Sequence, residues 1–271
     1  MADHDGWTFR EGGATAGRTV LLLPGALCTA AFYEELLDQP AAADAGVHFV
    51  AATPPGFGGN PMAPGFDMSL TAYAELVEEE AGRLGAVAIV GHSLFANVLI
   101  LVAERGHYHG PLVLLSPCLS KEDEEKDVRQ IGPLARIPGV GALVFRIAPL
   151  TFSSSMKGRL PPERHDELVG EMKENRPGAM RQLMVRYFEH LDEPGPGLAQ
   201  RLADSGAPAW VVRGDDDEVA IKQEEAAILE AAPNVTYVPL KGARHFSMFD
   251  QPAAVTETIL SAVGPQGPRS R

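Results

Sequence analysis

Length, composition and charge already exclude several classes of protein. The chain has 271 residues, of which 45% are hydrophobic and 22% charged, and this predicts one large folded domain or a domain carrying an insertion. Its 36 acidic residues against 23 Lys and Arg residues give a formal net charge of -13, which repels phosphate backbones and anionic membrane surfaces. We therefore expect no nucleic-acid partner.

The N-terminal residues and the cysteines indicate where the protein is expected to act. MADHDGWTFREGG has no basic segment followed by an apolar run, and no stretch reaches the roughly 18 apolar residues of a membrane span. We expect a cytoplasmic protein without a membrane span. Cys28 and Cys118 are the only cysteines and are expected to be reduced packing residues, so no metal site is predicted. No cofactor is expected, and the sequence leaves the oligomeric state open.

Short apolar runs that stop at Gly, Pro or a polar turn predict the strands of a mostly parallel sheet. They are TVLLLPG (19–25), HFVAATPPG (48–56), VAIVGHS (87–93), LVLLSP (112–117), AWVVRGD (209–215) and VTYVPLKG (235–242). Residues 69–84 carry apolar side chains at three- and four-residue spacing, with Ser69 as N-cap and Gly85 beyond the end. This alternation predicts an α/β fold with helices on both faces of the sheet.

Residues 119–203 interrupt the alternation, because no strand-like run occurs among them. The segment instead contains helical patterns separated by Pro and Gly: KEDEEKDVRQIGPLARI, VGALVFRIA, PPERHDELVGEMKEN and PGAMRQLMVRYFEHL. We expect the acidic run EDEEKD (122–127) to be a solvated helix face and the apolar stripe of the last pattern to serve helix packing. The predicted division is a core of residues 1–118 and 204–264, a helical cap insertion of residues 119–203, and a disordered tail of residues 265–271.

The stretch AIVGHSLFANV contains a near match to the nucleophile elbow Gly-x-Ser-x-Gly of serine hydrolases. Gly91 and Ser93 fit this pattern, whereas Phe95 occupies the position of the second glycine. Glycines flank such a serine because the tight strand-to-helix turn brings backbones close together. A bulky residue on the helix side therefore raises the question of whether Ser93 is still a nucleophile.

The partners that a serine nucleophile needs follow two later strands. A histidine must accept the serine proton, and a carboxylate must orient that histidine. Three adjacent carboxylates follow the strand AWVVRGD, and His245 follows the strand VTYVPLKG. The carboxylates are Asp215, Asp216 and Asp217. Serine, acid and histidine thus come in this chain order, each at the carboxyl end of a predicted strand.

With serine, acid and histidine in this chain order, the sequence resembles the α/β-hydrolase superfamily over nearly its whole length. Five stretches carry the resemblance: the strand and oxyanion loop LLLPGALCTAAFYEEL, the loop TPPGFGGN, the elbow GHSLF, the acid turn RGDDD and the histidine loop GARHFSMFDQP. Pro24 stands where His is usual in the family, and Thr53 where Asp is common. The resemblance implies the α/β-hydrolase fold with an inserted helical cap.

The resemblance also implies a role for particular residues. Ser93 would be the nucleophile and His245 the general base. The family spacing of three residues after the turn Gly214 selects Asp217 as the acid. Some members carry the acid after the earlier strand, where Asp123 lies, but Ser120-x-x-Asp123 is typical of a helix start, which we favour. The backbone N–H groups expected to form the oxyanion hole are those of Ala26 and Leu94.

The identity of the nucleophile indicates the reaction. The epoxide hydrolase and haloalkane dehalogenase branches, which this chain resembles, use Asp where it has Ser93, so we expect an acyl carbonyl as the site of attack. The expected activity is that of a serine hydrolase cleaving a small-to-medium, largely apolar carboxylic ester or lactone through an acyl-enzyme. The side chains expected to bind this apolar acyl substrate under the cap are Phe95, Leu143, Phe145, Phe152, Met184 and Phe188.

Two other functions are left open. A C–C bond hydrolase would use the same triad, with polar groups in the cap or near Thr53 and Asn60 holding a second carbonyl or carboxylate. A non-catalytic binding or accessory protein would result if Phe95 had disabled the elbow. Labelling with a fluorophosphonate separates the binding or accessory protein from the two enzymes. Product analysis on ester, lactone and diketone panels then distinguishes the ester or lactone hydrolase from the C–C bond hydrolase.

Overall fold

A seven-stranded sheet forms the centre of the computed structural model, which describes residues 3–219 and 221–265. Within these residues the strand order is β1-β3-β2-β4-β5-β6-β7, with β1 antiparallel to β3 and the other neighbours parallel. The strands are β1 (Thr8–Gly13), β2 (Arg18–Leu23), β3 (Val47–Thr53), β4 (Ala88–His92), β5 (Leu112–Leu115), β6 (Ala209–Gly214) and β7 (Val235–Leu240). The mostly parallel α/β sheet predicted from the sequence is confirmed.

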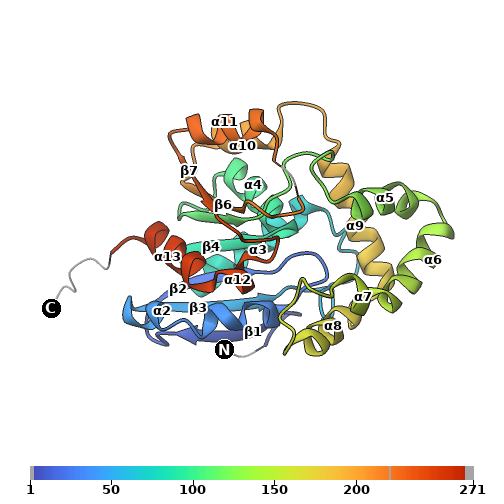
Figure 1. Cartoon of the computed structure of the whole chain (residues 1–271), viewed down its shortest axis with the longest axis horizontal. Coiled ribbons are helices and arrows are strands. Elements are labelled where there is room, and N and C mark those ends of the chain that lie inside the picture. Colours follow the sequence, from blue (N-terminus) through green and yellow to red (C-terminus); the bar gives the residue numbers. More distant parts are fainter. Residues whose placement is uncertain (1–2, 220, 266–271) are drawn as a thin grey trace.

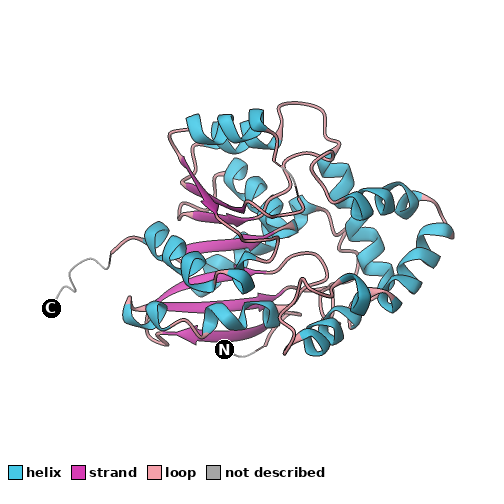
Figure 2. Cartoon of the chain, viewed as in Figure 1, coloured by secondary structure: helices cyan, strands magenta, loops and turns pink. Residues whose placement is uncertain are grey.

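Helices cover both faces of the sheet (Figures 1 and 2). On one face lie α3 (Leu70–Leu84), α4 (Leu94–Arg105), α10 (Leu198–Ser205) and α11 (Gln223–Ala231). On the other lie η1 (Ala30–Tyr33), α1 (Glu34–Leu37), α2 (Pro40–Asp44), α12 (Ser247–Asp250) and α13 (Pro252–Val263). Each face buries its own apolar cluster, so the central strands are covered on both sides. None of the described helices is long and apolar enough to cross a membrane.

The structure agrees with the predicted elements most closely where local signals are strong. The Ser69 hydroxyl accepts a hydrogen bond from the Ala72 N–H at 3.1 Å, and Gly85 ends α3 with a φ of 60°. The strand β1 is absent from the predicted set. It lies at the sheet edge with its residues only partly buried. An edge strand of this kind does not need an apolar run, and TFREGG has none, so the apolar pattern does not predict it.

The helices of the predicted insertion gather at one end of the sheet, beyond the carboxyl ends of the parallel strands (Figure 1). They are α5 (Lys126–Arg136), α6 (Val140–Ile147), η2 (Ala148–Leu150), α7 (Phe152–Ser155), α8 (His165–Lys173) and α9 (Pro177–Leu191). The predicted boundary at residue 203 falls within α10, which packs against α4 and α11 over the sheet. Residues 266–271 of the predicted tail lie outside the described residues.

Candidate active site

Ser93 lies at a sharp turn between β4 and α4. Its backbone has φ 51° and ψ -112°, a conformation that a non-glycine residue rarely adopts and that stores strain. Its N–H donates to the carbonyl of Leu115 at 2.8 Å on the neighbouring strand. The turn leaves Ser93 partly exposed while the residues on either side are buried. This is the geometry expected of a nucleophile elbow.

Phe95 takes the second glycine position of the elbow without crowding Ser93. Its side chain is fully buried, and its ring packs edge-on against Phe57 and Tyr73, with centroids 5.5 Å away in both cases. These residues come from the loop after β3 and from α3. The ring therefore points into the apolar cluster under α3 and α4. Phe95 is not among the residues that line the cavity beside Ser93, so the expected substrate contact by Phe95 is not found.

His245 and Asp217 form a buried pair. His245 lies in the loop between β7 and α12, and its Nδ1 is 3.0 Å from Oδ1 of Asp217. The side chain of Asp217 is fully buried, and His245 is 8% exposed. Because Asp217 engages Nδ1, the opposite ring nitrogen, Nε2, is the one available to take a proton from a nucleophile.

Burial and charge act in opposite directions on this pair. Burial disfavours the imidazolium form, but the contact with Asp217 outweighs it and raises the pKa of His245 above its usual 6.5. Burial also disfavours the carboxylate, yet the His245 contact and the nearby Arg213 guanidinium lower the pKa of Asp217 to about 2. Arg213 Nη1 lies 3.8 Å from Oδ2 of Asp217. Asp217 is therefore held ionised.

The main-chain carbonyl of His245 is held by two side chains from neighbouring strand ends. The Ser116 hydroxyl donates to this carbonyl at 3.2 Å, and Nε2 of His92 lies 3.0 Å from it. Burial and the neighbouring His245 lower the pKa of His92 to about 3, so His92 is neutral and its Nε2–H is the donor. The two bonds fix the loop that carries the expected general base.

The other carboxylates weighed as the acid lie away from His245. Asp215 and Asp216 are exposed, and Asp215 accepts the N–H of Gly242. Asp123 is buried, and it accepts the Ser120 hydroxyl at 2.5 Å. The expected helix start at Ser120 is wrong, because α5 begins only at Lys126.

The expected oxyanion donors lie on either side of Ser93. Leu94 is the first residue of α4, so its N–H is one of those at a helix start that have no acceptor within the helix. Ala26 lies in a turn closed by the Cys28 N–H, which donates to the Gly25 carbonyl at 3.1 Å. A methyl group on Gly25 would be 3.3 Å from Cβ of Ser93, so this turn packs directly against the elbow.

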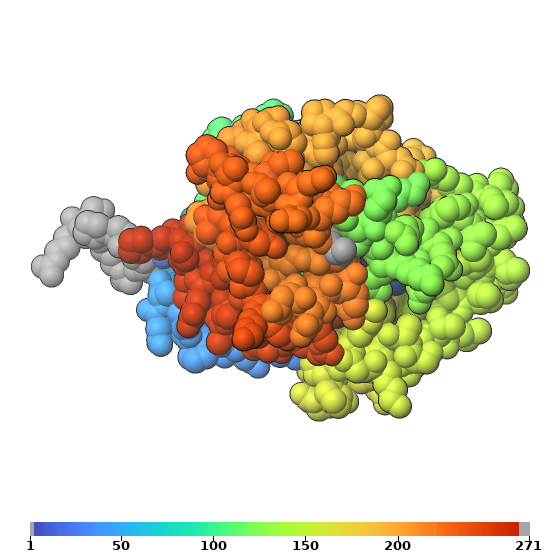
Figure 3. All heavy atoms as spheres, turned by 45° about the horizontal axis from the view of Figure 1, so that its top comes forward, coloured from blue at the N-terminus to red at the C-terminus, as the bar shows by residue number. Residues whose placement is uncertain are grey.

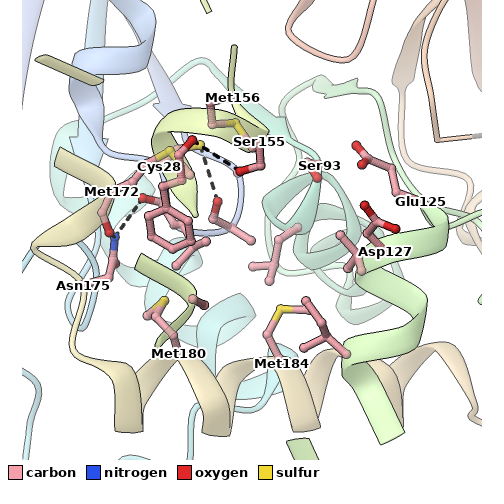
Figure 4. A pocket seen from close by; sticks show the side chains of 18 of the residues that line it. Cys28, Ser93, Glu125, Asp127, Ser155, Met156, Met172, Asn175, Met180 and Met184 are labelled. Carbon is pink, nitrogen blue, oxygen red and sulfur yellow. Dashed lines mark hydrogen bonds between the residues drawn. The ribbon is translucent and has the colours of Figure 1, made fainter. Parts of the chain in front are cut away.

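A cavity of about 510 Å³ separates the elbow from the helices of residues 126–191. Ser93, His245, Ala26 and Leu94 all line it. Figure 3 shows the surface hollowed where the green-to-yellow part of the chain meets the orange and red part. Figure 4 shows Ser93 facing into the cavity, with Met180 and Met184 projecting from α9 on the opposite side.

The residues expected to bind substrate divide into two groups. Phe145, Phe152 and Met184 line the cavity. Leu143 is 59% exposed on the outer side of α6, and Phe188 is buried against Gly132 and Tyr187. Helical periodicity places residues on a face, but it does not say whether that face meets the cavity, the core or solvent, and this explains the errors at Leu143 and Phe188.

The acidic run, expected to be a solvated helix face, contributes to the cavity wall. Glu124, Glu125 and Asp127 line it, and Glu124 accepts the Tyr187 hydroxyl at 2.6 Å. Glu125 forms a two-pronged ion pair with Arg159, at 2.8 and 3.0 Å. The expectation is wrong for Glu124 and Glu125, which are partly buried in an irregular segment before α5, whereas Asp127 is exposed within α5 as expected.

Three side chains of the site are absent from the sequence-based set. Arg213 is a charged residue within the buried strand β6, and a charge in such a strand is a usable signal of a functional neighbour. Ser116 directly follows β5, at the strand end where catalytic groups collect. Asn175 lies in the turn between α8 and α9, and no sequence pattern distinguishes it.

Comparison with known proteins agrees with the mostly parallel sheet and its surrounding helices. The family described as "Alpha/beta hydrolase family" matches residues 20–258. The chain belongs to this family, which is one of hydrolase enzymes. Among curated protein sequences, none matches the chain.

Solved structures share the fold at low sequence identity. A thermophilic esterase from Thermogutta terrifontis has a TM-score of 0.69 and 18% identity, with 93% of this chain and 91% of that chain covered. A haloalkane dehalogenase from Bradyrhizobium elkani has a TM-score of 0.71 and 17% identity, covering 95% and 93%. An esterase from Exiguobacterium antarcticum has a TM-score of 0.70 and 14% identity, covering 95% of each chain. These similarities concern the fold.

Proposed function

We propose that the protein is a serine hydrolase that cleaves small-to-medium, largely apolar carboxylic esters or lactones through an acyl-enzyme. The observation that carries the proposal is the buried Asp217–His245 pair, of which His245 lines the same cavity as Ser93 on its strained turn. A hydroxyl, a polarised imidazole and an ionised carboxylate are the groups that acyl transfer requires. Ser93 also occupies the position at which the haloalkane dehalogenase and epoxide hydrolase branches of the superfamily carry the nucleophilic aspartate.

The proposed reaction proceeds in two halves. Ser93 Oγ attacks the ester carbonyl and its proton passes to Nε2 of His245, while the N–H groups of Ala26 and Leu94 stabilise the oxyanion. Collapse of the tetrahedral intermediate breaks the C–O bond of the ester, and His245 returns the proton to the departing alcohol oxygen. Water then attacks the acyl-Ser93 carbonyl in the same way, releasing the acid and restoring Ser93.

The cavity supports an uncharged acyl substrate. Its volume of about 510 Å³ falls within the roughly 300–1,000 Å³ of small-molecule sites. Most of the lining is aliphatic, aromatic or thioether. At its polar end, Glu124, Glu125 and Asp127 face one cation, Arg159, which Glu125 already pairs. An excess of carboxylates disfavours substrates that carry a carboxylate of their own.

Two observations weigh against the C–C bond hydrolase. Thr53 Oγ1 accepts the Ala30 N–H at 2.9 Å, and Asn60 Nδ2 donates to the Thr53 carbonyl at 3.0 Å. Both side chains therefore bond to the backbone: Thr53, at the end of β3, holds the start of η1, and Asn60 holds the loop after β3. With Arg159 paired to Glu125, the cavity has no uncompensated cation among its described lining residues to hold a dienoate carboxylate.

The non-catalytic alternative depends on Phe95 disabling the elbow. The Phe95 ring packs against Phe57 and Tyr73 in the core, so it does not cover Ser93. The intact Asp217–His245 pair also argues for catalysis, since a binding protein has no need to keep a carboxylate ionised behind a buried imidazole.

Intact-mass analysis after fluorophosphonate treatment tests the proposed function. The wild type is expected to gain one adduct on Ser93, and Ser93→Ala is expected to gain none while keeping its thermal unfolding temperature. Turnover should be measured on p-nitrophenyl esters of increasing acyl length, on lactones and on β-diketones. A wild type without an adduct supports the binding protein, and turnover of diketones alone supports the C–C bond hydrolase.

A further inference from the structure

Asn175 connects the helices above the cavity to the turn that carries an expected oxyanion donor. It is 4% exposed and lies between α8 and α9. Its Nδ2 donates to the Leu27 carbonyl at 2.8 Å and to the Met172 carbonyl at 2.9 Å. Its Oδ1 accepts the Gly58 N–H at 3.1 Å. One amide thus joins three segments, and Figure 4 shows it beside Met172 and Cys28 at the cavity wall.

Leu27, which Asn175 contacts, has an unfavourable backbone conformation. Its φ is 65°, and it occupies the third position of the turn closed by the Cys28 N–H and the Gly25 carbonyl. Turns with a positive φ at this position favour glycine or asparagine, and a leucine is strained there. The Leu27–Cys28 peptide is held at both ends, its N–H by Gly25 and its carbonyl by Asn175. These two bonds oppose relaxation of Leu27 to a negative φ.

Relaxation of Leu27 would change the oxyanion hole, because Leu27 directly follows Ala26. If φ of Leu27 changes, the planar Ala26–Leu27 peptide must turn as well. This peptide is bonded directly to Ala26, whose N–H must point at the oxyanion. The other contacts that α8 and its N-cap residue Arg164 make with the segment after β2 lie further along the chain. Glu171 accepts the Thr29 hydroxyl at 2.9 Å, and Arg164 donates to the Ala31 carbonyl at 2.9 Å.

We infer that Asn175 is a positioning residue for the oxyanion hole: it holds Leu27 in its strained conformation and so makes the alignment of the Ala26 N–H depend on the docking of the α8–α9 turn. The inference rests on the proposed function, because it assumes that an oxyanion forms beside Ala26. It gives the α8–α9 turn a part in catalysis beyond enclosing the substrate.

The first test removes the bond to Leu27 in two ways. Asn175→Leu keeps the side-chain size but loses all three hydrogen bonds, whereas Asn175→Asp keeps an acceptor for Gly58 and loses both donors. Both variants are expected to lower kcat by roughly 10- to 100-fold with little change in KM, since the lost interaction acts on the transition state. The inhibition constant of a trifluoromethyl ketone, whose adduct carries an oxyanion, should rise by a similar factor.

The second test separates positioning from simple attachment of the helices. Glycine adopts a positive φ without strain, so Asn175→Leu should reduce kcat far less when it is combined with Leu27→Gly than when it is made alone. Thr29→Val is the matched control, because it removes a bond of similar length between α8 and the same segment, together with the bond from the Ala31 N–H, without touching Leu27. It should lower the unfolding temperature while kcat stays near that of the wild type.

The outcomes distinguish this inference from the proposed function. If the wild type shows no Ser93-dependent turnover, the proposed function fails. If the wild type turns over substrate and Asn175→Leu alters only stability or KM, Asn175 is structural and the inference is wrong. An equal loss of kcat from Asn175→Leu with and without Leu27→Gly, or an equal loss in Thr29→Val, would also overturn it.

Discussion

A methyl group on Gly91 would lie 2.5 Å from the carbonyl oxygen of Phe95. The backbone of the first turn of α4 therefore passes directly over the end of β4, and only a residue without a side chain fits beneath it. Phe95 takes part in this contact with Gly91 through its main-chain carbonyl, while its side chain points into the core. The elbow thus requires glycine at position 91 and accepts phenylalanine at position 95.

Gly91→Ala is predicted to disturb the elbow. The added methyl must push the turn containing Phe95 outward and Ser93 with it, so we expect turnover to fall at least tenfold and stability by about 1–3 kcal/mol. Gly82→Ala is the matched control, because Gly82 lies within α3 with open space around it. Alanine there should be neutral or stabilising by up to about 1 kcal/mol. Denaturant unfolding and steady-state kinetics measure both effects.

Phe95→Ala is predicted to affect stability rather than selectivity. Removing a fully buried ring that contacts Phe57 and Tyr73 should cost about 3–5 kcal/mol. The relative kcat/KM for short and long acyl esters should be unchanged when it is expressed per folded molecule. A shift toward bulkier acyl groups would mean that the vacated space joins the cavity, contrary to the packing of this ring in the core.

The acid assignment is tested by four asparagine variants. Asp217→Asn should lower turnover by roughly four orders of magnitude, because the imidazole would then favour the wrong tautomer. Asp215→Asn and Asp216→Asn should differ from the wild type by less than about threefold, since both side chains are exposed. Asp123→Asn should also remain active, although the loss of its charge beside Lys222 can lower stability. An active Asp217→Asn together with an inactive Asp123→Asn contradicts the assignment.

The pH dependence of kcat/KM is predicted from His245. Catalysis requires neutral His245, so activity should fall as the pH decreases through its pKa, which lies above 6.5. In Asp217→Asn the residual activity should persist to lower pH, because the group that raises the pKa of His245 is gone. His92, with a pKa of about 3, stays neutral across this range. If the acidic limb of the kcat/KM profile lies at the same pH in Asp217→Asn as in the wild type, the titrating group is not His245.

The stability contributions of the same pair have opposite pH dependences. The pKa of Asp217 is lower in the folded chain, so its stabilisation is present at neutral pH and is lost as the pH falls toward about 2. The pKa of His245 is raised, so its contribution is present at acidic pH and is lost as the pH rises through its folded value.

Glu125→Gln is predicted to change the preference for substrate charge. Removing one carboxylate releases Arg159 from its two-pronged pair, so esters that carry a carboxylate should improve several-fold relative to neutral esters. Because partly exposed charges are screened by salt, the change should shrink at about 1 M salt. Glu122→Gln is the control: it belongs to the same acidic run but pairs with Lys222 outside the cavity.

Much of the fold could be predicted because its signals are local. Buried parallel strands are continuous apolar runs, and α3 carries both caps in its sequence. The strand β1 could not be found this way, since its pairing with β3 depends on tertiary contacts rather than on an apolar pattern. The same applies to α10, most of which falls within the predicted insertion although it packs against α4 and α11.

The candidate site could be predicted only in part. Ser93, Asp217 and His245 lie at strand ends that a parallel sheet brings to one edge, so their places after three strands predict that they lie close together. The choice of Asp217 among three adjacent aspartates comes from the family resemblance. The cavity wall depends on how the helices of residues 126–191 lie over that edge, and one sequence does not specify this. Phe95 illustrates the difference, because it is two residues from Ser93 while its ring packs against Phe57 and Tyr73 in the core.

The cavity wall includes Met156, Met172, Met180 and Met184. Unbranched thioether chains change rotamer at little cost and fill irregular space, so this wall can reshape around acyl chains of different outline. The same chemistry makes it vulnerable, because oxidation to the sulfoxide replaces an apolar surface with a polar one. Breadth of acyl preference and sensitivity to peroxide are therefore expected to arise from the same four side chains.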